Sequence, residues 1–392
     1  MTAPTNRRAA VGLVIAIAAI AANLRPAVAS VGPVLDDIQR SLHLSDAEVS
    51  AVSAAPAVCF GLFAPLGAWL SRRLGMHRSV TVLTVGLVGG LLLRLGPNLA
   101  TFVAGTLVAA IGIAALNVVT PVLVKADFPR HTGLVMGIYT TALVGVAAIS
   151  AGVTVPAEHA VGHGWRGGLA VWTVLAVVGL AIWAPQTRDA EEPVLDLPRM
   201  GSLLRDRVAW AVTGYFGLQS LGLYALLAWL PSLFVDHGYS DAKAGALLSV
   251  SVAVQAPIAL LTPSLAHRRP HQVPLVVGST LMTSAGFLGL LLAPTAAPWV
   301  WVVLLGIGQG SSFPLSLTML VLRSPTPQAT TALSSMAQTG GYLIAAIGVL
   351  LVGVLHAATG SWSVSVGLLL ALTVPQQLCG FVAGRPRRPL EG

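Results

Sequence analysis

Twelve apolar stretches, each long enough to cross a lipid bilayer, constrain the fold of this chain more than any other feature. A spanning helix needs roughly 17–25 mainly apolar residues, and such windows follow one another here with short polar connections. They lie at residues 9–35, 46–71, 79–95, 100–126, 133–156, 167–185, 208–235, 241–266, 273–293, 299–322, 328–355 and 361–382. Only 9% of the residues are charged and the mean hydropathy is +0.82, which excludes a water-soluble globular domain. We therefore predict an all-α membrane protein with twelve transmembrane helices.

The basic residues predict how these helices are oriented. Of the 22 lysines and arginines, 17 fall near one set of helix ends, and the opposite set carries only Arg40, Arg94, Arg166 and Lys243. Cytoplasmic loops of membrane proteins are enriched in Lys and Arg, so we expect both termini in the cytoplasm and the protein in a bacterial inner membrane. Because the formal charge of +8 is gathered in these short connections, we interpret it as loop anchoring and expect no nucleic-acid partner.

The sequence also predicts two halves. The longest polar stretch, residues 186–207, reads as a cytoplasmic linker between a six-helix half at 1–185 and another at 208–392. A shift of 196 residues places Asn23 on Gln219 and Gly112 on Gly308. A shift of 195 places Ser45 on Ser240, and both serines are predicted helix N-caps. Parallel halves of this kind are typical of one large transporter class.

The first span carries the one charge placed deep in the membrane. It reads Asn23-Leu24-Arg25-Pro26 near its middle, and an arginine at that depth costs about 2.5–3.5 kcal/mol on insertion scales. Pro26 removes a backbone donor and should loosen and kink the helix beside it. The shift of 196 places Arg25 on Leu221, whereas a structural arginine needed by each half would be expected twice. We expect Arg25 to bind an anion, with a structural arginine as the alternative.

Other polar and aromatic residues inside the spans complete the predicted site. Buried amides without partners cost about 1–3 kcal/mol, so the intramembrane glutamines and Asn117 should face the bundle interior, where they bind solute or join helices. Aromatic rings could hold a planar solute, although Trp229 could instead belong to an interfacial belt. Arg94, near the end of the third span, is expected to extend to the membrane surface, with a functional role as the alternative. The predicted substrate-binding residues are Asn23, Arg25, Asn117, Tyr139, Gln219, Tyr224, Trp229, Gln309, Phe313 and Gln338.

Several of these stretches resemble a known family. They are residues 23–26, the run Gly217 to Pro231, the run Gly306 to Pro314 and the run Ser335 to Tyr342. Together they resemble the cyanate permease and 2-nitroimidazole exporter branch of the major facilitator superfamily. The basic link at 67–78 resembles that superfamily's signature, with its acidic position not clearly filled. The resemblance implies twelve helices in two pseudo-symmetric six-helix halves, alternating access, and a central cavity lined mainly by helices one, four, seven and ten.

These observations favour transport over catalysis. The chain has two lysines, neither in a phosphate-binding loop, and no nucleophile, acid–base or metal-ligand motif, so we expect no enzyme activity, no cofactor and no metal. We predict a secondary active transporter of a small anionic or polarised planar solute. The alternative is an exporter of an aromatic drug such as a nitroimidazole, with Arg25 structural; a channel or membrane sensor is a further one. No Asp or Glu falls mid-span, so protons are only one candidate coupling ion, and we expect a monomer whose partners are the solute and the lipid bilayer.

Overall fold

The computed structural model describes residues 7–187 and 203–386. These residues include twelve helices long and apolar enough to cross a membrane, and within them the regular structure is entirely helical. The prediction of an all-α membrane protein with twelve spans is therefore confirmed. Residues 188–202, the larger part of the expected linker at 186–207, lie outside the described residues.

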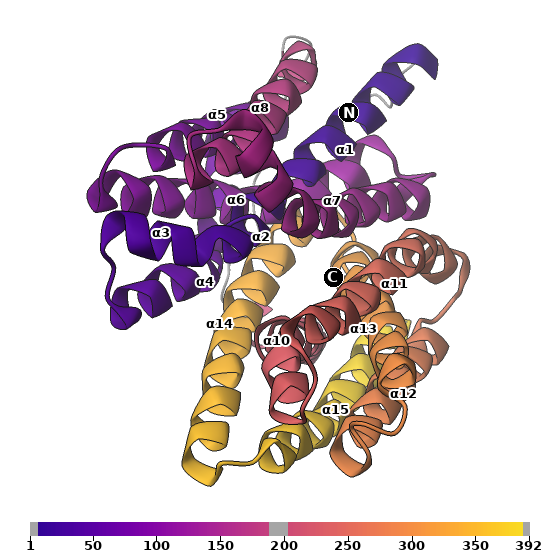
Figure 1. The fold of residues 1–392 in the computed structure, drawn as a ribbon. Coiled ribbons are helices and arrows are strands. Elements are labelled where there is room, and N and C mark those ends of the chain that lie inside the picture. Colours follow the sequence, from indigo (N-terminus) through magenta and orange to yellow (C-terminus); the bar gives the residue numbers. More distant parts are fainter. Residues whose placement is uncertain (1–6, 188–202, 387–392) are drawn as a thin grey trace. The chain divides into compact units, whose positions relative to one another are not determined.

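The chain divides into two compact units, of which the first, unit 1, holds the N-terminal helices (Figure 1). The first turns of α7, Thr132–Gly137, group with the second unit. The elements of unit 1 are α1 (Arg7–Leu24), α2 (Pro26–Ala29), η1 (Gly32–Val34), α3 (Leu35–Leu42), α4 (Asp46–Leu74), α5 (Met76–Arg94), α6 (Leu99–Asp127), α7 (Thr132–Val161), α8 (Trp165–Trp183) and η2 (Ala184–Thr187).

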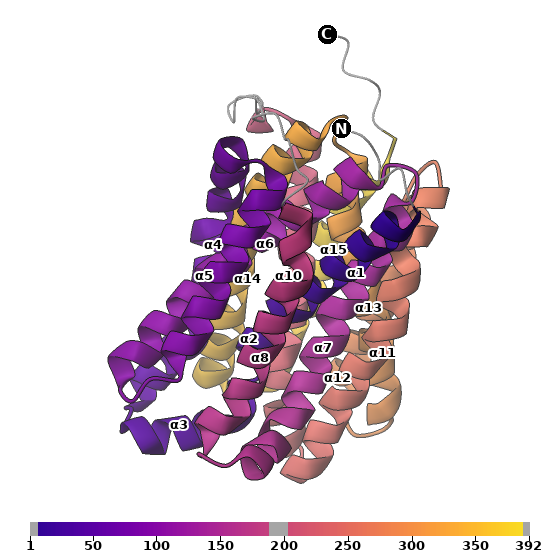
Figure 2. The ribbon, with the colours of Figure 1, turned by 90° about the horizontal axis from the view of Figure 1, so that it is seen from above.

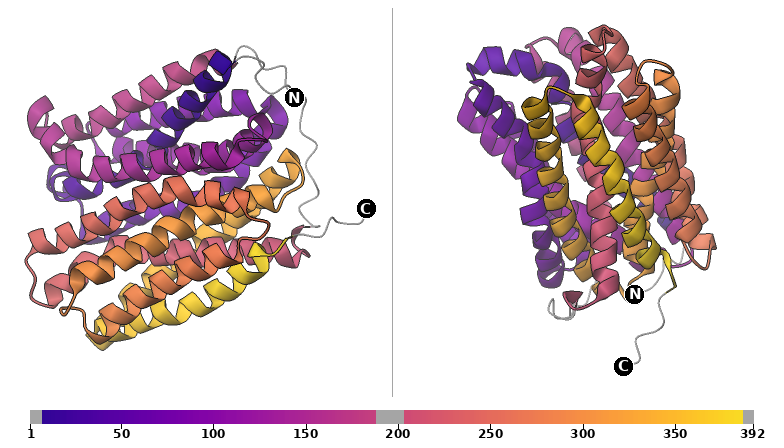
Figure 3. Two further views of the ribbon diagram at one scale, coloured as in Figure 1. Left: turned by 90° about the vertical axis from the view of Figure 1, so that its right-hand side faces the viewer. Right: turned by 90° about the horizontal axis from the view of Figure 1, so that it is seen from below.

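The second unit, unit 2, consists of long helices joined by short turns. Its elements are α10 (Arg207–Asp236), α11 (Asp241–Arg268), α12 (Val273–Leu292), α13 (Pro298–Leu322), α14 (Pro327–Thr359) and α15 (Trp362–Gly384). Helices α14 and α15 run side by side within this unit, as the right panel of Figure 3 shows. Many apolar side chains on the unit's outside are exposed, including Leu292 at 73% and Ile347 at 67%, as expected for surfaces that contact lipid.

Serine caps begin the second span of each unit, as the sequence predicted. The Ser45 hydroxyl accepts a hydrogen bond from the Glu48 amide (3.4 Å), while the Glu48 carboxylate accepts one from the Ser45 amide (2.8 Å). This reciprocal pair satisfies two amides that the helix itself cannot. In unit 2 the Ser240 hydroxyl accepts from the Lys243 amide at 3.4 Å, without a carboxylate to return the bond.

The predicted internal repeat is visible in the packing of equivalent helix pairs. In unit 1, α5 and α6 lie side by side (Figure 2), and a Cβ added at Gly112 of α6 would lie 3.1 Å from the Leu83 carbonyl oxygen of α5. In unit 2, a Cβ added at Gly308 of α13 would lie 2.9 Å from the Ser279 carbonyl oxygen of α12. Gly308 and Ser279 are the residues on which the shift of 196 places Gly112 and Leu83. The two units therefore repeat a close helix contact in one register, which only a small residue permits.

The first span of unit 1 is interrupted at Pro26, where the sequence predicted a kink. Helix α1 ends at Leu24, Arg25 caps the single turn of α2, and Pro26 occupies its first position. The Arg25 carbonyl accepts hydrogen bonds from the amides of Val28 (3.0 Å) and Ala29 (2.9 Å). The backbone then continues through η1 into α3. The interruption frees backbone groups inside the membrane, where each must find another partner.

Candidate functional site

Three of the predicted site residues come together in unit 1, each from a different helical element. The Arg25 guanidinium, at the start of α2, lies close enough to the Tyr139 hydroxyl of α7 to interact with it electrostatically. That hydroxyl donates to Asn117 Oδ1 of α6 at 3.5 Å. Tyr139 and Asn117 are buried, whereas Arg25 is partly exposed. A partly exposed cation backed by buried hydrogen-bonding groups can receive a small anion without first losing all of its hydration.

Asn23 lies on the same span but has other contacts. Its amide nitrogen donates to the Ala19 carbonyl one turn earlier in α1, at 2.7 Å. A Cβ added at Gly179 of α8 would lie 2.5 Å from this nitrogen, so Asn23 packs tightly against α8. These contacts favour a role for Asn23 in joining α1 to α8.

The expectation for Arg94 was wrong. The side chain does not extend to the membrane surface: it is 1% exposed, and its Nη1 donates to the Ala27 carbonyl of α2 at 2.5 Å. The interruption of the first span leaves the Ala27 carbonyl without a helical partner, so it is a strong hydrogen-bond acceptor inside the unit. The guanidinium of Arg94 binds this carbonyl in place of water at the membrane surface. The Nε and Nη2 groups of Arg94 have no hydrogen-bond partner among the described residues.

In unit 2, two of the predicted glutamines are buried with unsatisfied polar atoms. Gln219 of α10 donates to the Phe216 carbonyl (3.0 Å) and the Ser220 hydroxyl (2.7 Å), but its Oε1 has no partner in the described part of the chain. Gln309 of α13 is 0% exposed, and neither of its amide atoms has a described partner. A Cβ added at Gly222 would lie 2.9 Å from Gln309 Nε2, so the amide rests on the backbone of α10. A buried amide without a hydrogen bond is costly, so these two side chains are candidates for the solute site.

The remaining predicted residues of unit 2 lie on α10, α13 and α14. Gln338 donates to the Ser334 hydroxyl on its own helix at 2.9 Å, and Phe313 is buried on α13. The Tyr224 ring of α10 lies 6.4 Å from the Tyr342 ring of α14. Tyr342 in turn meets Phe216 edge to face, with 5.3 Å between ring centroids. Tyr224 therefore belongs to an aromatic cluster between α10 and α14.

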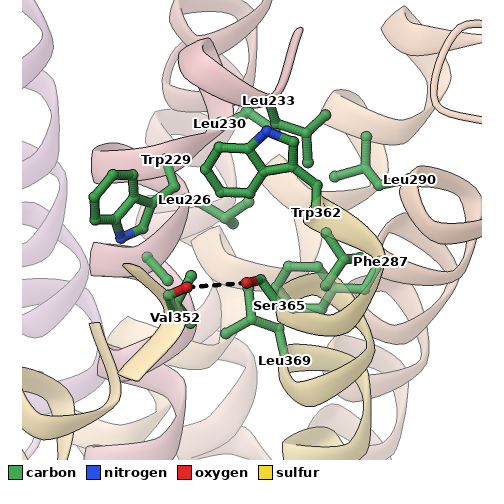
Figure 4. A pocket seen from close by; sticks show the side chains of 12 residues that line it. Leu226, Trp229, Leu230, Leu233, Phe287, Leu290, Val352, Trp362, Ser365 and Leu369 are labelled. Carbon is green, nitrogen blue, oxygen red and sulfur yellow. Dashed lines mark hydrogen bonds between the residues drawn. The ribbon is translucent and has the colours of Figure 1, made fainter. Parts of the chain in front are cut away.

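Trp229 lines an apolar pocket of unit 2 (Figure 4). Its indole nitrogen donates to the Val349 carbonyl of α14 at 3.3 Å, and its ring lies 6.0 Å from that of Trp362. The pocket has a volume of about 20 Å³, and the hydroxyl of Ser365 that lines it already donates to the Val352 carbonyl at 2.9 Å. A solute pocket is an order of magnitude larger, at roughly 300–1,000 Å³. Trp229 thus packs α10 against α14 and α15.

A titratable pair lies at one end of unit 2. The Trp362 indole nitrogen donates to Asp236 Oδ2 at 2.7 Å, and His356 Nε2 lies 3.6 Å from the same oxygen. The His356 ring stacks on Trp362 with 3.7 Å between centroids. This arrangement couples the ends of α10, α14 and α15 through one carboxylate.

The fold and these side chains define a class of protein. Twelve spanning helices bury amides, hydroxyls and a guanidinium within an otherwise apolar bundle, and polar groups held at such cost inside membrane helices mark solute pathways. This combination is typical of a membrane transporter.

Comparison with known proteins identifies the family. Residues 11–349 match the model of the Major Facilitator Superfamily, and the chain belongs to this superfamily. It is 37% identical to an uncharacterized transporter, YycB, of Bacillus subtilis, over 96% of this chain and 94% of that protein. It is 34% identical to the 2-nitroimidazole transporter of Escherichia coli, over 96% of each chain. It is 30% identical to the cyanate transport protein CynX of Escherichia coli, over 89% of this chain and 91% of that protein.

A solved structure supports the fold alone. The proton:xylose symporter XylE aligns with a TM-score of 0.77 over 94% of each chain, at 12% identity. The family and its members are transporters of small molecules, so the protein is a transporter and not an enzyme. The resemblance noted from residues 23–26 and the spans of unit 2 is confirmed.

Sequence reasoning missed two groups at the α1–α2 break. Arg94 was interpreted as a surface residue because its place near a helix end hides its contact with Ala27. The Ser30 hydroxyl is 0% exposed and has no described partner, yet a serine among alanines and valines gives no local signal. The position of Ser30 inside the first span could have suggested that residue, whereas no sequence signal indicates the contact of Arg94.

Proposed function

We propose that the protein is a secondary active transporter that moves a small anionic or polarised planar solute across a bacterial inner membrane by alternating access. Arg25 is the anion-recognition residue in this proposal. The excess of basic residues in one set of connections supports a topology with both termini in the cytoplasm. The proposed halves are residues 1–185 and 208–392, joined by a cytoplasmic linker.

The observation that carries the proposal is the environment of Arg25. A partly exposed arginine caps the α1–α2 break beside the buried Tyr139–Asn117 pair. The repeat places Leu221 at the equivalent position of unit 2, which supports a role that the fold does not require of both units. A guanidinium offers several donors in a rigid fork, suited to a small planar or linear anion.

The relatives support the chemistry of the solute. One is a transporter of 2-nitroimidazole and another of cyanate. Cyanate is a small anion, and a nitroimidazole is a planar ring with a polarised nitro group. Both could accept hydrogen bonds from Arg25.

The buried amides of unit 2 have a proposed role of their own. Gln219 and Gln309 are 0% exposed and keep donors or acceptors that have no partner among the described residues. We assign them, with Gln338 and Phe313, to solute recognition. Asn23 and Trp229 belong to the proposed set as well, but their side chains already donate to the backbone carbonyls of Ala19 and Val349. The His356–Asp236 pair is the candidate for proton coupling, since its carboxylate lies 3.6 Å from a titratable ring.

The experiment is a ligand-dependent thermal-shift assay on the purified protein with potassium cyanate and 2-nitroimidazole, repeated on Arg25→Ala and Arg25→Lys. A ligand that binds only the folded protein adds about 2.7 kcal/mol of apparent stability at 100 times its Kd. We expect cyanate to stabilise the wild type, and Arg25→Ala to abolish this effect. The matched control is Arg40→Ala, an arginine 76% exposed in its side chain and paired with Asp37, which should respond like the wild type. Equal stabilisation of Arg25→Ala and wild type by cyanate would contradict the proposal.

A second candidate function is export of an aromatic compound, with Arg25 structural. The cluster of Tyr224, Tyr342 and Phe216 beside Gln219 favours it, because offset and edge-to-face rings can accept a further planar ring. In this case 2-nitroimidazole stabilises Arg25→Ala as well as wild type, and Tyr342→Ala loses the effect.

A further inference from the structure

A second arginine meets the turn that carries Arg25. Arg94, the last residue of α5, donates through Nη1 to the carbonyl of Ala27, two residues after Arg25, at 2.5 Å. In a continuous α-helix this carbonyl would accept from the Val31 amide. That amide donates instead to the Val28 carbonyl at 3.2 Å. Arg94 therefore supplies a donor where the interrupted helix does not.

The backbone of Arg94 is rigidly held. A Cβ added at Gly105 of α6 would lie 2.3 Å from the Arg94 amide nitrogen, so the last turn of α5 rests directly on α6. The following turn is held by Arg166 of α8, whose Nε and Nη2 donate to the Gly96 carbonyl at 3.2 and 3.1 Å. Helix α6 also carries Asn117, so Arg94 links the α2 turn to the helix that holds one of the proposed solute ligands.

The charge of Arg94 is not neutralised. The side chain is 1% exposed, it forms no ion pair within the described part of the chain, and its Nε and Nη2 have no hydrogen-bond partner there. The nearby Ser30 hydroxyl is likewise buried and unpartnered among the described residues. A buried charge without a carboxylate is costly, and in a medium of low dielectric its field extends further than in water.

The repeat indicates that the fold itself does not need this arginine. The shift of 196 places Arg94 on Leu290, which lines the apolar pocket of unit 2. The α5–α6 contact at Gly112 is repeated at Gly308 in unit 2, while Trp301 replaces the Gly105 on which Arg94 rests. A leucine thus satisfies the packing at this position in unit 2. Both arginines near the α1–α2 break, Arg25 and Arg94, have leucine counterparts in unit 2.

We propose that Arg94 is a positioning residue for solute recognition: it fixes the α1–α2 break through Ala27, and its uncompensated charge raises the affinity of the Arg25 site for anions. The inference rests on the proposed function of Arg25. In this proposal Arg25 contacts the solute. Arg94 affects solute binding indirectly, by holding the backbone of the break and through the electrostatic field of its charge.

The test uses Arg94→Met, Arg94→Gln and Arg94→Lys in the full-length protein. The readouts are cyanate uptake into proteoliposomes, the melting temperature without ligand, and hydrogen exchange of the amides from Val28 to Val34. We expect Arg94→Met to raise KM for cyanate about tenfold or more, since small displacements of a binding group are costly, with Vmax little changed. Arg94→Lys should restore most of the affinity. The melting temperature of Arg94→Met should be unchanged or higher, because an unpaired buried charge has been removed, while exchange at the break becomes faster.

Other outcomes overturn the proposal. A lower melting temperature with unchanged KM in Arg94→Met would make Arg94 purely structural, and unchanged exchange would remove its positioning role. If Arg94→Met does not fold, Arg94→Gln, which keeps a donor for Ala27 but no charge, must show the raised KM. Arg25→Ala in the same assay separates the two proposals: normal cyanate uptake there contradicts the proposed function. Lost uptake in Arg25→Ala beside normal KM in every Arg94 variant contradicts only this inference.

Discussion

The first helices of the two units differ at one repeated position. In unit 1 the span breaks after Leu24, and Arg25 begins a new turn beside Tyr139. In unit 2 the equivalent helix, α10, continues unbroken from Arg207 to Asp236. Leu221 takes the place of Arg25 there, 4% exposed and packed so closely on Gly348 that a Cβ on that glycine would lie 1.9 Å from it. One position thus serves packing in unit 2, and in unit 1 it holds the arginine to which we assign anion recognition.

The units also differ in how they hold polar groups. Unit 1 places charges at the break, Arg25 and Arg94, where freed carbonyls accept from a guanidinium. Unit 2 places neutral amides on continuous helices, and Gln309 remains without a described partner. A helix break therefore makes a deep charge tolerable, because it supplies the acceptors that a continuous helix keeps for itself.

The largest effect is expected when Arg25 and its counterpart Leu221 are each replaced by the residue of the other unit. Leu221→Arg should lower the free energy of unfolding by about 3 kcal/mol or more, since it forces an unpaired charge into the packed contact with Gly348. Arg25→Leu should leave the stability unchanged or higher, while it abolishes the response to cyanate. Chemical unfolding in detergent measures both.

A stable Leu221→Arg protein would contradict the comparison, because position 221 would then tolerate a charge as position 25 does. Conversely, a strongly destabilised Arg25→Leu protein would show that Arg25 holds the break together. Arg40→Leu, in the exposed part of the same segment, controls for the general effect of removing an arginine.

An intermediate effect is expected for the amides of unit 2. Gln309→Met should preserve or raise the free energy of unfolding by about 1 kcal/mol, because it removes a buried amide that has no described partner. The matched control is Gln272→Met. The Gln272 side chain donates to the Ala266 and Arg269 carbonyls at 2.9 and 3.1 Å and accepts from Arg323. Loss of these bonds should lower the free energy of unfolding by about 2–3 kcal/mol.

The contrast between the two glutamines is measured by the same unfolding assay, together with solute affinity. If Gln309 recognises solute, Gln309→Met raises the Kd of the solute although the protein is no less stable. A destabilised Gln309→Met protein with unchanged affinity would assign the amide to helix packing.

The smallest effect concerns the two serine caps and their dependence on pH. Hydrogen bonds from the Ser45 amide, and secondly from its hydroxyl, lower the pKa of Glu48 below its ordinary value of 4.5. A lowered pKa in the folded protein means that the stabilisation is fully present above pH 4.5 and is lost as the pH falls through the folded value. Glu48→Ala should therefore weaken the first turn of α4 at neutral pH, with a difference from wild type that disappears under acid conditions.

Hydrogen exchange of the first turn of α4 between pH 6 and pH 3.5 measures this effect. The counterpart cap in unit 2 is the control, because Lys243 has no carboxyl group to titrate, and Lys243→Ala should show no such dependence. A pH-independent difference for Glu48→Ala would mean that the carboxylate does not contribute through the cap.

The sequence was informative wherever the signal is local or periodic. Twelve apolar windows and the serine caps each depend on residues close together in the chain, and the structure confirms them. The kink expected at Pro26 is also local, and the structure shows it as a full break. It was misleading for Arg94, because a position near a helix end says nothing about an acceptor 67 residues away. For Trp229 the indole's partner lies 120 residues away, and no local pattern announces such a contact.

The sequence by itself determined the membrane class, the number of spans, the repeat and the presence of a deep arginine. Those properties follow from the cost of placing polar groups in hydrocarbon, which acts on each segment separately. Only the tertiary structure decided which polar groups meet: Arg25 with Tyr139 and Asn117, Arg94 with Ala27, and Gln309 against Gly222. These pairings depend on how distant helices pack and on which backbone carbonyls a break leaves open, and composition and spacing record neither.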